Sequence, residues 1–301
     1  MSSGIRLAQI DDEPVRHVRR HVSPLGMVTA PFVGSWRIAT NRVRHLPTTV
    51  ILGTDEAATE LLFNKMTTHP RCYGAAGPAV EYFSKHATRP MAWYRSQFPW
   101  RRRVWRRQGH VLDASSSYLP SAAVLRKMHS VLPNARTIVL LGDPVTQAFS
   151  HYQNAKARGA ESRKFVEAVE QEIRAGEFAA GWGVGLRDGA KPMSGCVARG
   201  YYALQLEVLA KVYRRNRILV LEAANLFADT AATCNRAFDY MGLDDCEVEA
   251  CEADRTASSP VADPRAVNLL RQHYRPYDEM LSEFLEQRCS WMTPVVQSAA
   301  A

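Results

Sequence analysis

Acidic side chains and a histidine lie close to the short apolar runs of this sequence, where they could perform acid/base chemistry. Glu56 lies just after one such run, and Asp113 lies at the end of another. Glu81 lies between these two runs, and His151 follows a third. Carboxylates and imidazoles can exchange protons with a substrate that lies within hydrogen-bond reach. The catalytic candidates of this sequence are therefore Glu56, Glu81, Asp113 and His151.

The apolar runs have the length and composition of buried strands, and the segments between them have helical periodicity. The predicted strands are 48–53, 110–113, 136–141 and 217–221. The predicted helices are 55–66, 120–131, 144–158, 163–175, 197–213, 230–241 and 264–289. This alternation predicts an α/β fold, in which a central parallel sheet has helices on both faces. Because ligands of such sheets bind at the carboxyl ends of the strands, the loops after Leu52, Asp113 and Leu141 form the candidate site.

The composition is that of a folded globular protein with an excess of basic residues. The chain has 301 residues, of which 46% are hydrophobic and 23% charged, and its net charge is +8. Such a charge favours anionic partners. The segment Trp100–Arg107 holds five arginines and two tryptophans, which can contact phosphates, stack on bases or lie on a membrane. The alternative is a solvated helix face that is packed by its two tryptophans.

The chain is predicted to contain one main domain. Residues 1–45 are interpreted as an N-terminal extension, 46–290 as the domain and 291–301 as a C-terminal tail. The charged N-terminus is not a secretory signal, and the apolar runs are too short to span a bilayer, so a cytoplasmic location is the default expectation. His17 and His21 have the i, i+4 spacing of metal ligands, but a third ligand is not evident, so no metal site is predicted.

Several stretches of this sequence resemble the motifs of one family. Ile51–Leu62 is similar to G-x-x-K-x-G-T-x-x-L, and Leu141–Tyr152 is similar to R-D-P-x-x-R-A-x-S-x-Y. Ala198–Leu206 is similar to R-G-x-Y-x-x-x-L. The sequence thereby resembles the PAPS-dependent sulfotransferases, particularly the heparan-sulfate type and their bacterial relatives. PAPS is 3′-phosphoadenosine 5′-phosphosulfate, and the resemblance implies a P-loop-like sulfotransferase fold over roughly residues 48–285.

The resemblance also implies which residues would hold PAPS. Gly53 and Thr59 match the first motif, whose loop binds the 5′-phosphosulfate at a helix N-terminus, where free amides and the helix dipole favour an anion. Ser150 matches a serine that holds the 3′-phosphate in the family, and Arg199 matches the arginine of the third motif. The cofactor-binding candidates are therefore Gly53, Thr59, Ser150 and Arg199.

Charged or catalytic residues of the family's motifs are replaced at five positions, namely Glu56, Ala79, Ala114, Gly142 and Gln147. Glu56 stands where the family has a lysine that would stabilise charge on the departing phosphate. Ala79 stands at the position of the expected base, and Glu81, two residues later, could take its place. A simpler interpretation of Glu56 is that it only complements the dipole of the helix that it begins.

Three functions stay open. The sequence does not decide whether the protein is an enzyme, but it favours a diverged enzyme of the sulfotransferase family with atypical chemistry. The first, which we favour, is a repurposed protein of this fold that does not use PAPS and binds or converts a neutral or cationic small molecule, with secondary metabolism as one setting. The second is an active PAPS-dependent sulfotransferase whose missing cations come from Arg187, Lys191, Arg199 or Arg255. The third is a non-catalytic binding protein that meets an anionic partner through Trp100–Arg107.

Overall fold

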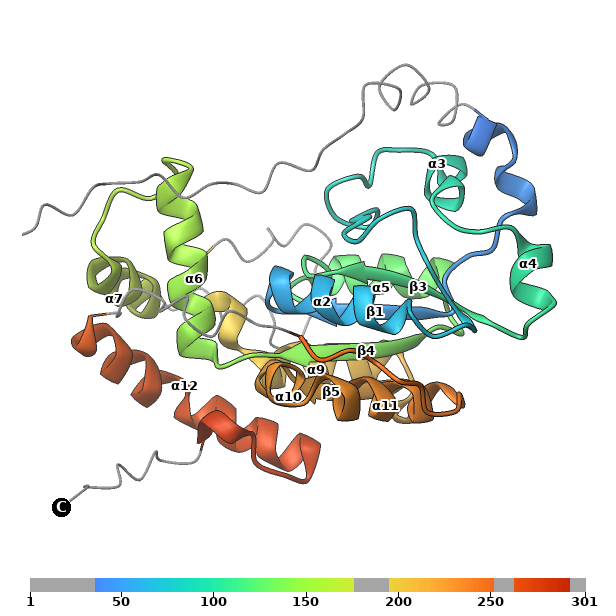
Figure 1. Cartoon of the computed structure of the whole chain (residues 1–301). Helices are drawn as coiled ribbons and strands as arrows, with labels where there is room; N and C mark the ends of the chain where they lie inside the picture. Colours follow the sequence, from blue (N-terminus) through green and yellow to red (C-terminus); the bar gives the residue numbers. More distant parts are fainter. Residues whose placement is uncertain (1–35, 176–194, 252–262, 293–301) are drawn as a thin grey trace, which may run out of the picture.

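The centre of the protein is a five-stranded parallel sheet (Figure 1). The structure, a computed structural model, describes residues 36–175, 195–251 and 263–292. The strands are β1 (Thr49–Gly53), β2 (Cys72–Gly74), β3 (His110–Ser115), β4 (Arg136–Leu141) and β5 (Ile218–Glu222). Their order in the sheet is β2-β3-β1-β4-β5, and each neighbouring pair is parallel.

Helices connect and cover these strands. The longer ones are α2 (Glu56–Met66), α5 (Ala122–Val131), α6 (Pro144–Ala157), α7 (Phe165–Ala175), α9 (Tyr202–Val212), α11 (Thr230–Met241) and α12 (Pro264–Leu285). The shorter ones are α3 (Met91–Ser96), α4 (Arg101–Trp105) and α10 (Ala223–Ala228). The 3-10 turns are η1 (Asn41–Val43), η2 (Ala198–Gly200), η3 (Arg215–Arg217) and η4 (Ser290–Met292).

Neighbouring residues of each strand point to opposite faces of the sheet, and both faces are apolar. In β1, Val50 and Leu52 belong to a cluster that includes residues of α5 and α9. Ile51 belongs to a second cluster, which includes residues of α2, α10 and α11. A third cluster joins α6, α7 and α12. The sheet is therefore covered on both sides, and a helical layer extends beyond the carboxyl ends of its strands.

The predicted fold class is confirmed, and the differences from the predicted elements have local causes. The helix predicted over 197–213 is a 3-10 turn followed by α9, because Tyr201 adopts a non-helical backbone with φ −78° and ψ 59°. The last helix ends before residue 289, because Glu286 takes a left-handed φ of 58°. β2 and α10 escaped prediction, since elements this short carry no measurable periodicity.

Part of the predicted N-terminal extension packs on the domain. Arg44 is only 2% exposed, and its guanidinium donates a hydrogen bond of 2.8 Å to the carbonyl of Phe98. The same guanidinium lies over the rings of Trp36 and Trp100. Residues 36–44 therefore contact the segment that precedes α4, while residues 1–35, including His17 and His21, lie outside the described ranges.

Two further observations concern the predictions about location. Within the described ranges, no helix combines the length and the hydropathy that crossing a membrane requires. The six cysteines all lie in those ranges, and each is a free thiol. The cytoplasmic location stays a prediction.

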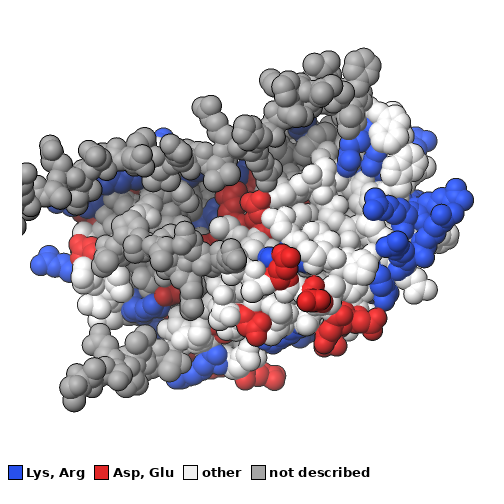
Figure 2. All heavy atoms as spheres, in the orientation of Figure 1, with Lys and Arg blue, Asp and Glu red and all other residues white. Residues whose placement is uncertain are grey.

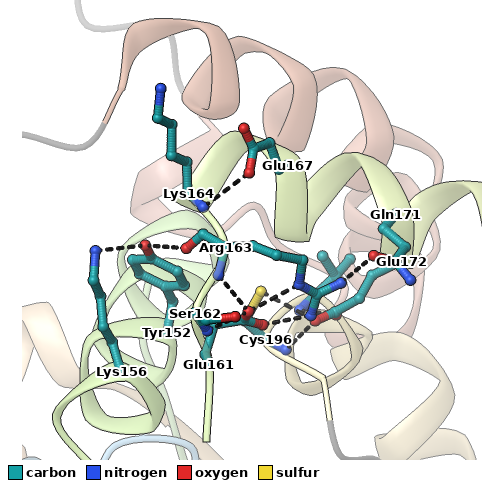
Figure 3. A network of polar contacts seen from close by, with 11 residues as sticks. Tyr152, Lys156, Glu161, Ser162, Arg163, Lys164, Glu167, Gln171, Glu172 and Cys196 are labelled. Carbon is teal, nitrogen blue, oxygen red and sulfur yellow. Dashed lines mark hydrogen bonds and ion pairs between the residues drawn. The ribbon is translucent and has the colours of Figure 1, made fainter. Parts of the chain in front are cut away.

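A polar network ties α7 to the segment that leads into η2 (Figure 3). The carboxylate of Glu172 accepts hydrogen bonds from the backbone N–H of Cys196 at 2.9 Å and of Val197 at 2.8 Å. The Cys196 thiol donates to the same carboxylate, and burial together with this negative charge raises the pKa of the thiol. A Cβ at Gly195 would lie 2.2 Å from Glu172 Oε2, so only glycine leaves room for the carboxylate. Glu172 thereby anchors the turn that carries Arg199.

Glu172→Gln is expected to lower the free energy of unfolding by roughly 1–3 kcal/mol, because one charge-assisted bond to a backbone N–H is lost. Urea unfolding of the parent and the variant measures this difference. Glu170→Gln, on the same helix, is the matched control, since its ion pair with Arg174 is exposed and contributes about 0–1 kcal/mol. Equal effects of the two substitutions would contradict the anchoring role.

Asp113 is a fully buried carboxyl group in β3. Its Oδ2 accepts a hydrogen bond of 2.8 Å from the Tyr94 hydroxyl, and its Oδ1 has no hydrogen-bond partner among the described residues. Burial raises the pKa of Asp113 to about 7, although the hydrogen bond from Tyr94 acts in the opposite direction. A substantial fraction of this carboxyl group is therefore protonated near neutral pH.

Asp113→Asn is expected to remove a pH dependence of stability. The pKa of Asp113 is about 7 in the folded protein and 3.8 for an unperturbed group, so the folded state binds the proton more tightly. The free energy of unfolding of the parent therefore falls as the pH rises from about 4 to about 7, by up to ~1.4 kcal/mol per unit of pKa difference. Urea unfolding of both proteins at about pH 5 and about pH 7.5 tests this. If the parent and the variant lose the same free energy of unfolding between the two pH values, the prediction is wrong.

Candidate functional site

A cleft of about 470 Å³ opens at the carboxyl ends of β1 and β4. It is walled by the N-terminus of α2, the segments around Glu81 and Ser116, α6 and η2. The predicted site residues that line it are Glu56, Glu81, Ser150, His151 and Arg199. The other three do not line it: Gly53 and Thr59 are buried at the start of α2, and Asp113 is buried in β3.

The N-terminus of α2 is capped by a carboxylate of the chain itself. Asp55 has an extended backbone, and its side chain accepts a hydrogen bond of 2.9 Å from the N–H of Ala58. Aspartate is among the best N-cap residues, because it satisfies a free N–H and complements the helix dipole. Glu56 follows in the first turn and is exposed to the cleft. This helix start therefore presents negative charge where helix starts ordinarily attract anions.

Gly53 and Thr59 act together in shaping the turn before α2. The Thr59 hydroxyl donates a hydrogen bond of 2.5 Å to the carbonyl of Asp55. A Cβ at Gly53 would lie 1.7 Å from this hydroxyl oxygen, so no other residue fits there without a rearrangement. Both residues thus fix the backbone of the loop from its buried side, and neither of them lines the cleft.

The start of α6 is held by a second carboxylate. Asp143 accepts a hydrogen bond of 2.9 Å from the N–H of Val145 and two from the guanidinium of Arg271, at 2.8 and 2.5 Å. These contacts fix α6 against α12. Ser150 and His151 lie about two turns further along α6, so the same carboxylate helps to set their position in the cleft.

Acidic and basic side chains both line the cleft. The lining acids are Asp55, Glu56, Glu60 and Glu81, and the lining bases are Lys85, Arg158 and Arg199. Lys85 Nζ lies 2.5 Å from the Glu81 carboxylate, so these two charges largely compensate each other. The α2 end of the cleft is therefore acidic, while two arginines lie towards α6 and η2.

Glu81 reaches the cleft from a strained segment. Ala79 and Glu81 have positive φ angles of 57° and 48°, a conformation that is unfavourable by roughly 1–2 kcal/mol for residues with a Cβ. The Ala79 N–H donates to the carbonyl of Ala114, and the Glu81 N–H donates to the Ser115 hydroxyl, which holds this backbone in place. The carboxylate that could replace the family's base is thus held by the end of β3.

His151 and Arg199 are neighbours in the partly buried end of the cleft. Burial, together with the charges of Arg199 and Arg158, lowers the pKa of His151 to about 4. Its imidazole is therefore neutral at physiological pH and can accept a proton. Burial also lowers the pKa of Arg199, while the carboxylates of Glu81 and Glu56 act in the opposite direction. Arg199 Nε is buried and has no hydrogen-bond partner within the described ranges.

The sequence analysis missed two cations of this cleft. Arg158 lies eight residues after Ser150, which is about two turns along the same face of a helix, so helical periodicity could have predicted it. Lys85 lies in a loop segment, where no periodicity places a side chain. Arg187, Lys191 and Arg255, which were proposed to supply cations, lie outside the described residues.

No family model matches the chain. Individual proteins that are similar to it are sulfotransferases, as the sequence motifs predict. The heparan sulfate glucosamine 3-O-sulfotransferase 6 of Homo sapiens is 26% identical over 201 residues, which is 66% of this chain and 53% of the relative. The heparan sulfate glucosamine 3-O-sulfotransferase 3B1 of Mus musculus is 23% identical over 200 residues, which is 66% of this chain and 47% of the relative. The chain thus spans about half the length of these curated relatives.

A solved structure shares the fold. The sulfotransferase from Alicyclobacillus acidocaldarius matches with a TM-score of 0.61 at 20% identity, over 83% of this chain and 100% of that protein. The relatives found by sequence and the neighbour found by structure represent the two groups that the motifs resemble, namely the heparan-sulfate type and the bacterial type. The chain therefore has the fold of a sulfotransferase, and its sequence is similar to that of the heparan-sulfate sulfotransferases.

Proposed function

We propose that this chain is a repurposed member of the family, whose cleft binds or converts a neutral or cationic small molecule without using PAPS. One observation carries the proposal: the Asp55 carboxylate occupies the N-terminus of α2 and accepts the N–H of Ala58 at 2.9 Å. Glu56 stands beside it in place of the family's lysine. Two carboxylates therefore lie at the loop that resembles the family's phosphosulfate-binding loop.

Electrostatics make this loop a poor site for a phosphosulfate. Two like charges about 4 Å apart repel by ~4 kcal/mol at an effective dielectric constant near 20. A difference of this size changes an affinity or a rate by on the order of a thousandfold. The same carboxylates stabilise a cationic group and tolerate a neutral one, so the sign of the charge at α2 supports a ligand of that class.

Proton transfer is the chemistry for which the cleft is best equipped. The neutral imidazole of His151 can accept a proton, and Glu56 and Glu81 supply carboxylates from two other sides of the cleft. These three side chains are the proposed acid/base residues. Asp113, the fourth sequence candidate, is buried beneath the cleft and has no direct access to a ligand in it.

A second function is favoured by a different observation. Arg158 and Arg199 both line the cleft near Ser150, and they could supply the cations that Gly142 and Gln147 lack. The curated relatives are sulfotransferases by name. Under this alternative the chain is an active PAPS-dependent sulfotransferase with a rearranged cofactor site. The third function, a non-catalytic binding protein that uses Trp100–Arg107, needs no catalysis in the cleft.

Binding of adenosine 3′,5′-bisphosphate should separate the first two functions. The unmodified protein is expected to show no rise in melting temperature with this nucleotide. The triple variant Asp55→Asn, Glu56→Lys, Gly142→Arg should gain one, because it keeps an N-cap, removes two negative charges and adds two positive ones. A Cβ at Gly142 meets no heavy atom of the described residues within 4 Å, so a side chain can begin there without a clash. The melting temperature of each protein is measured by thermal unfolding with and without the nucleotide.

The size of the shift makes the test decisive. A ligand at 100 times its dissociation constant adds ~2.7 kcal/mol to the free energy of unfolding, which is a readily measured rise in melting temperature. A clear rise with the unmodified protein would overturn the proposal and support the alternative. In that case Arg158→Gln and Arg199→Gln should each remove the rise, whereas Arg214→Gln, at an exposed position outside the cleft, should leave it unchanged.

A further inference from the structure

Exposed apolar side chains gather on one surface, at the end of the sheet opposite the cleft. Seven large apolar side chains are exposed within the described ranges, and five of them fall in two segments: Trp36, Ile38, Val43, Trp100 and Trp105. The segments adjoin, since the rings of Trp36 and Trp100 are 5.6 Å apart and Arg44 pairs with Trp100 in an antiparallel bridge. Residues 36–44 and 100–107 are called the Trp–Arg surface below.

This surface is also the most basic part of the face shown in Figure 2, where Lys and Arg atoms gather at the end occupied by α4. Arg101, Arg102, Arg106 and Arg107 are exposed, and none of them forms an ion pair with a described residue. Arginines of this group and Trp100 surround a hollow of about 460 Å³. The surface therefore combines unpaired positive charge with exposed apolar side chains.

We propose that the Trp–Arg surface binds a bilayer that contains anionic lipids. Tryptophan side chains favour the boundary between headgroups and acyl chains, and arginines are attracted to the negative surface potential of such a bilayer. A nucleic acid or another polyanion would account for the arginines and for stacking on Trp105. It would not account for the exposure of Ile38 and Val43, which are 40% and 46% exposed.

The geometry supports a peripheral contact with a lipid surface. Trp105 is 83% exposed at the end of α4, while Val104, its neighbour in the chain, is 2% exposed and anchors this helix to the domain. Arg44 is fixed between Trp36 and Trp100 by cation–π contacts, so the base of the surface is ordered without a ligand. A symmetric contact with a second copy would bring the arginines of both copies together, which is unfavourable.

Docking in this way leaves the cleft accessible. Both segments of the Trp–Arg surface precede strands, since β1 begins at Thr49 and β3 at His110. The cleft lies at the opposite, carboxyl ends of the strands. A bilayer that contacts α4 therefore does not cover the cleft, and ligand binding and lipid binding can be measured independently.

Sedimentation of the full chain with lipid vesicles tests this proposal. Binding is expected with vesicles of phosphatidylcholine and phosphatidylglycerol, and little binding with phosphatidylcholine alone. Arg102→Gln combined with Arg106→Gln should weaken binding on the order of tenfold or more, since each basic residue near an anionic surface contributes roughly a factor of five. Arg214→Gln combined with Arg236→Gln removes the same charge at exposed positions elsewhere and should change binding less than about twofold.

A second variant distinguishes lipid from other anionic partners. Trp105→Ala should weaken vesicle binding and leave retention on heparin unchanged, because only the bilayer offers the indole an apolar environment. Thermal unfolding checks that each variant is folded. Absence of binding to anionic vesicles would overturn the proposal, as would equal losses in the two double variants. Unchanged vesicle binding by Trp105→Ala would also overturn it, and salt-dependent binding of heparin or single-stranded DNA alone would instead indicate a polyanion partner.

Discussion

The first N–H groups of a helix lack acceptors within the helix, and in a parallel sheet the helices that follow the strands begin at one edge. The chain satisfies this need with its own carboxylates after β1 and β4, which both end at the cleft. Asp55 caps α2 after β1, and Asp143 caps α6 after β4. Because Asp143 also binds Arg271 of α12, one carboxylate fixes the start of α6 and the position of the outer helical layer. The walls of the cleft depend on these two caps.

The charges of the cleft come from the elements that these caps hold in place. α2 contributes acids in its first two turns, whereas α6 and η2 contribute arginines. Glu172 holds the turn that precedes Arg199 through two backbone N–H groups, so this cation is positioned by α7 at a distance from the cleft. The charges are therefore built into the supporting elements, and loop movement within the described ranges is not needed to explain them.

Periodicity made the longer elements predictable. Residues 230–241 were predicted as a helix, and α11 has these bounds, with Asp229 as its N-cap and Gly242 as its C-cap. Asp113 shows what periodicity alone did not reveal. It was placed at a strand end facing a ligand, but β3 continues to Ser115, and alternation turns Asp113 towards the buried ring of Tyr94. Lys85 was missed because its position depends on the path of an irregular segment, which no local pattern encodes.

The contact between Gly53 and Thr59 makes the shape of the first loop independent of what binds to it. The hydroxyl of Thr59 bonds to the backbone of Asp55 in the space that the absent Cβ of Gly53 leaves. The shape of this loop and its charge therefore depend on different residues, since those that face the cleft take no part in this contact, and a substitution there can change the charge while the backbone keeps its path.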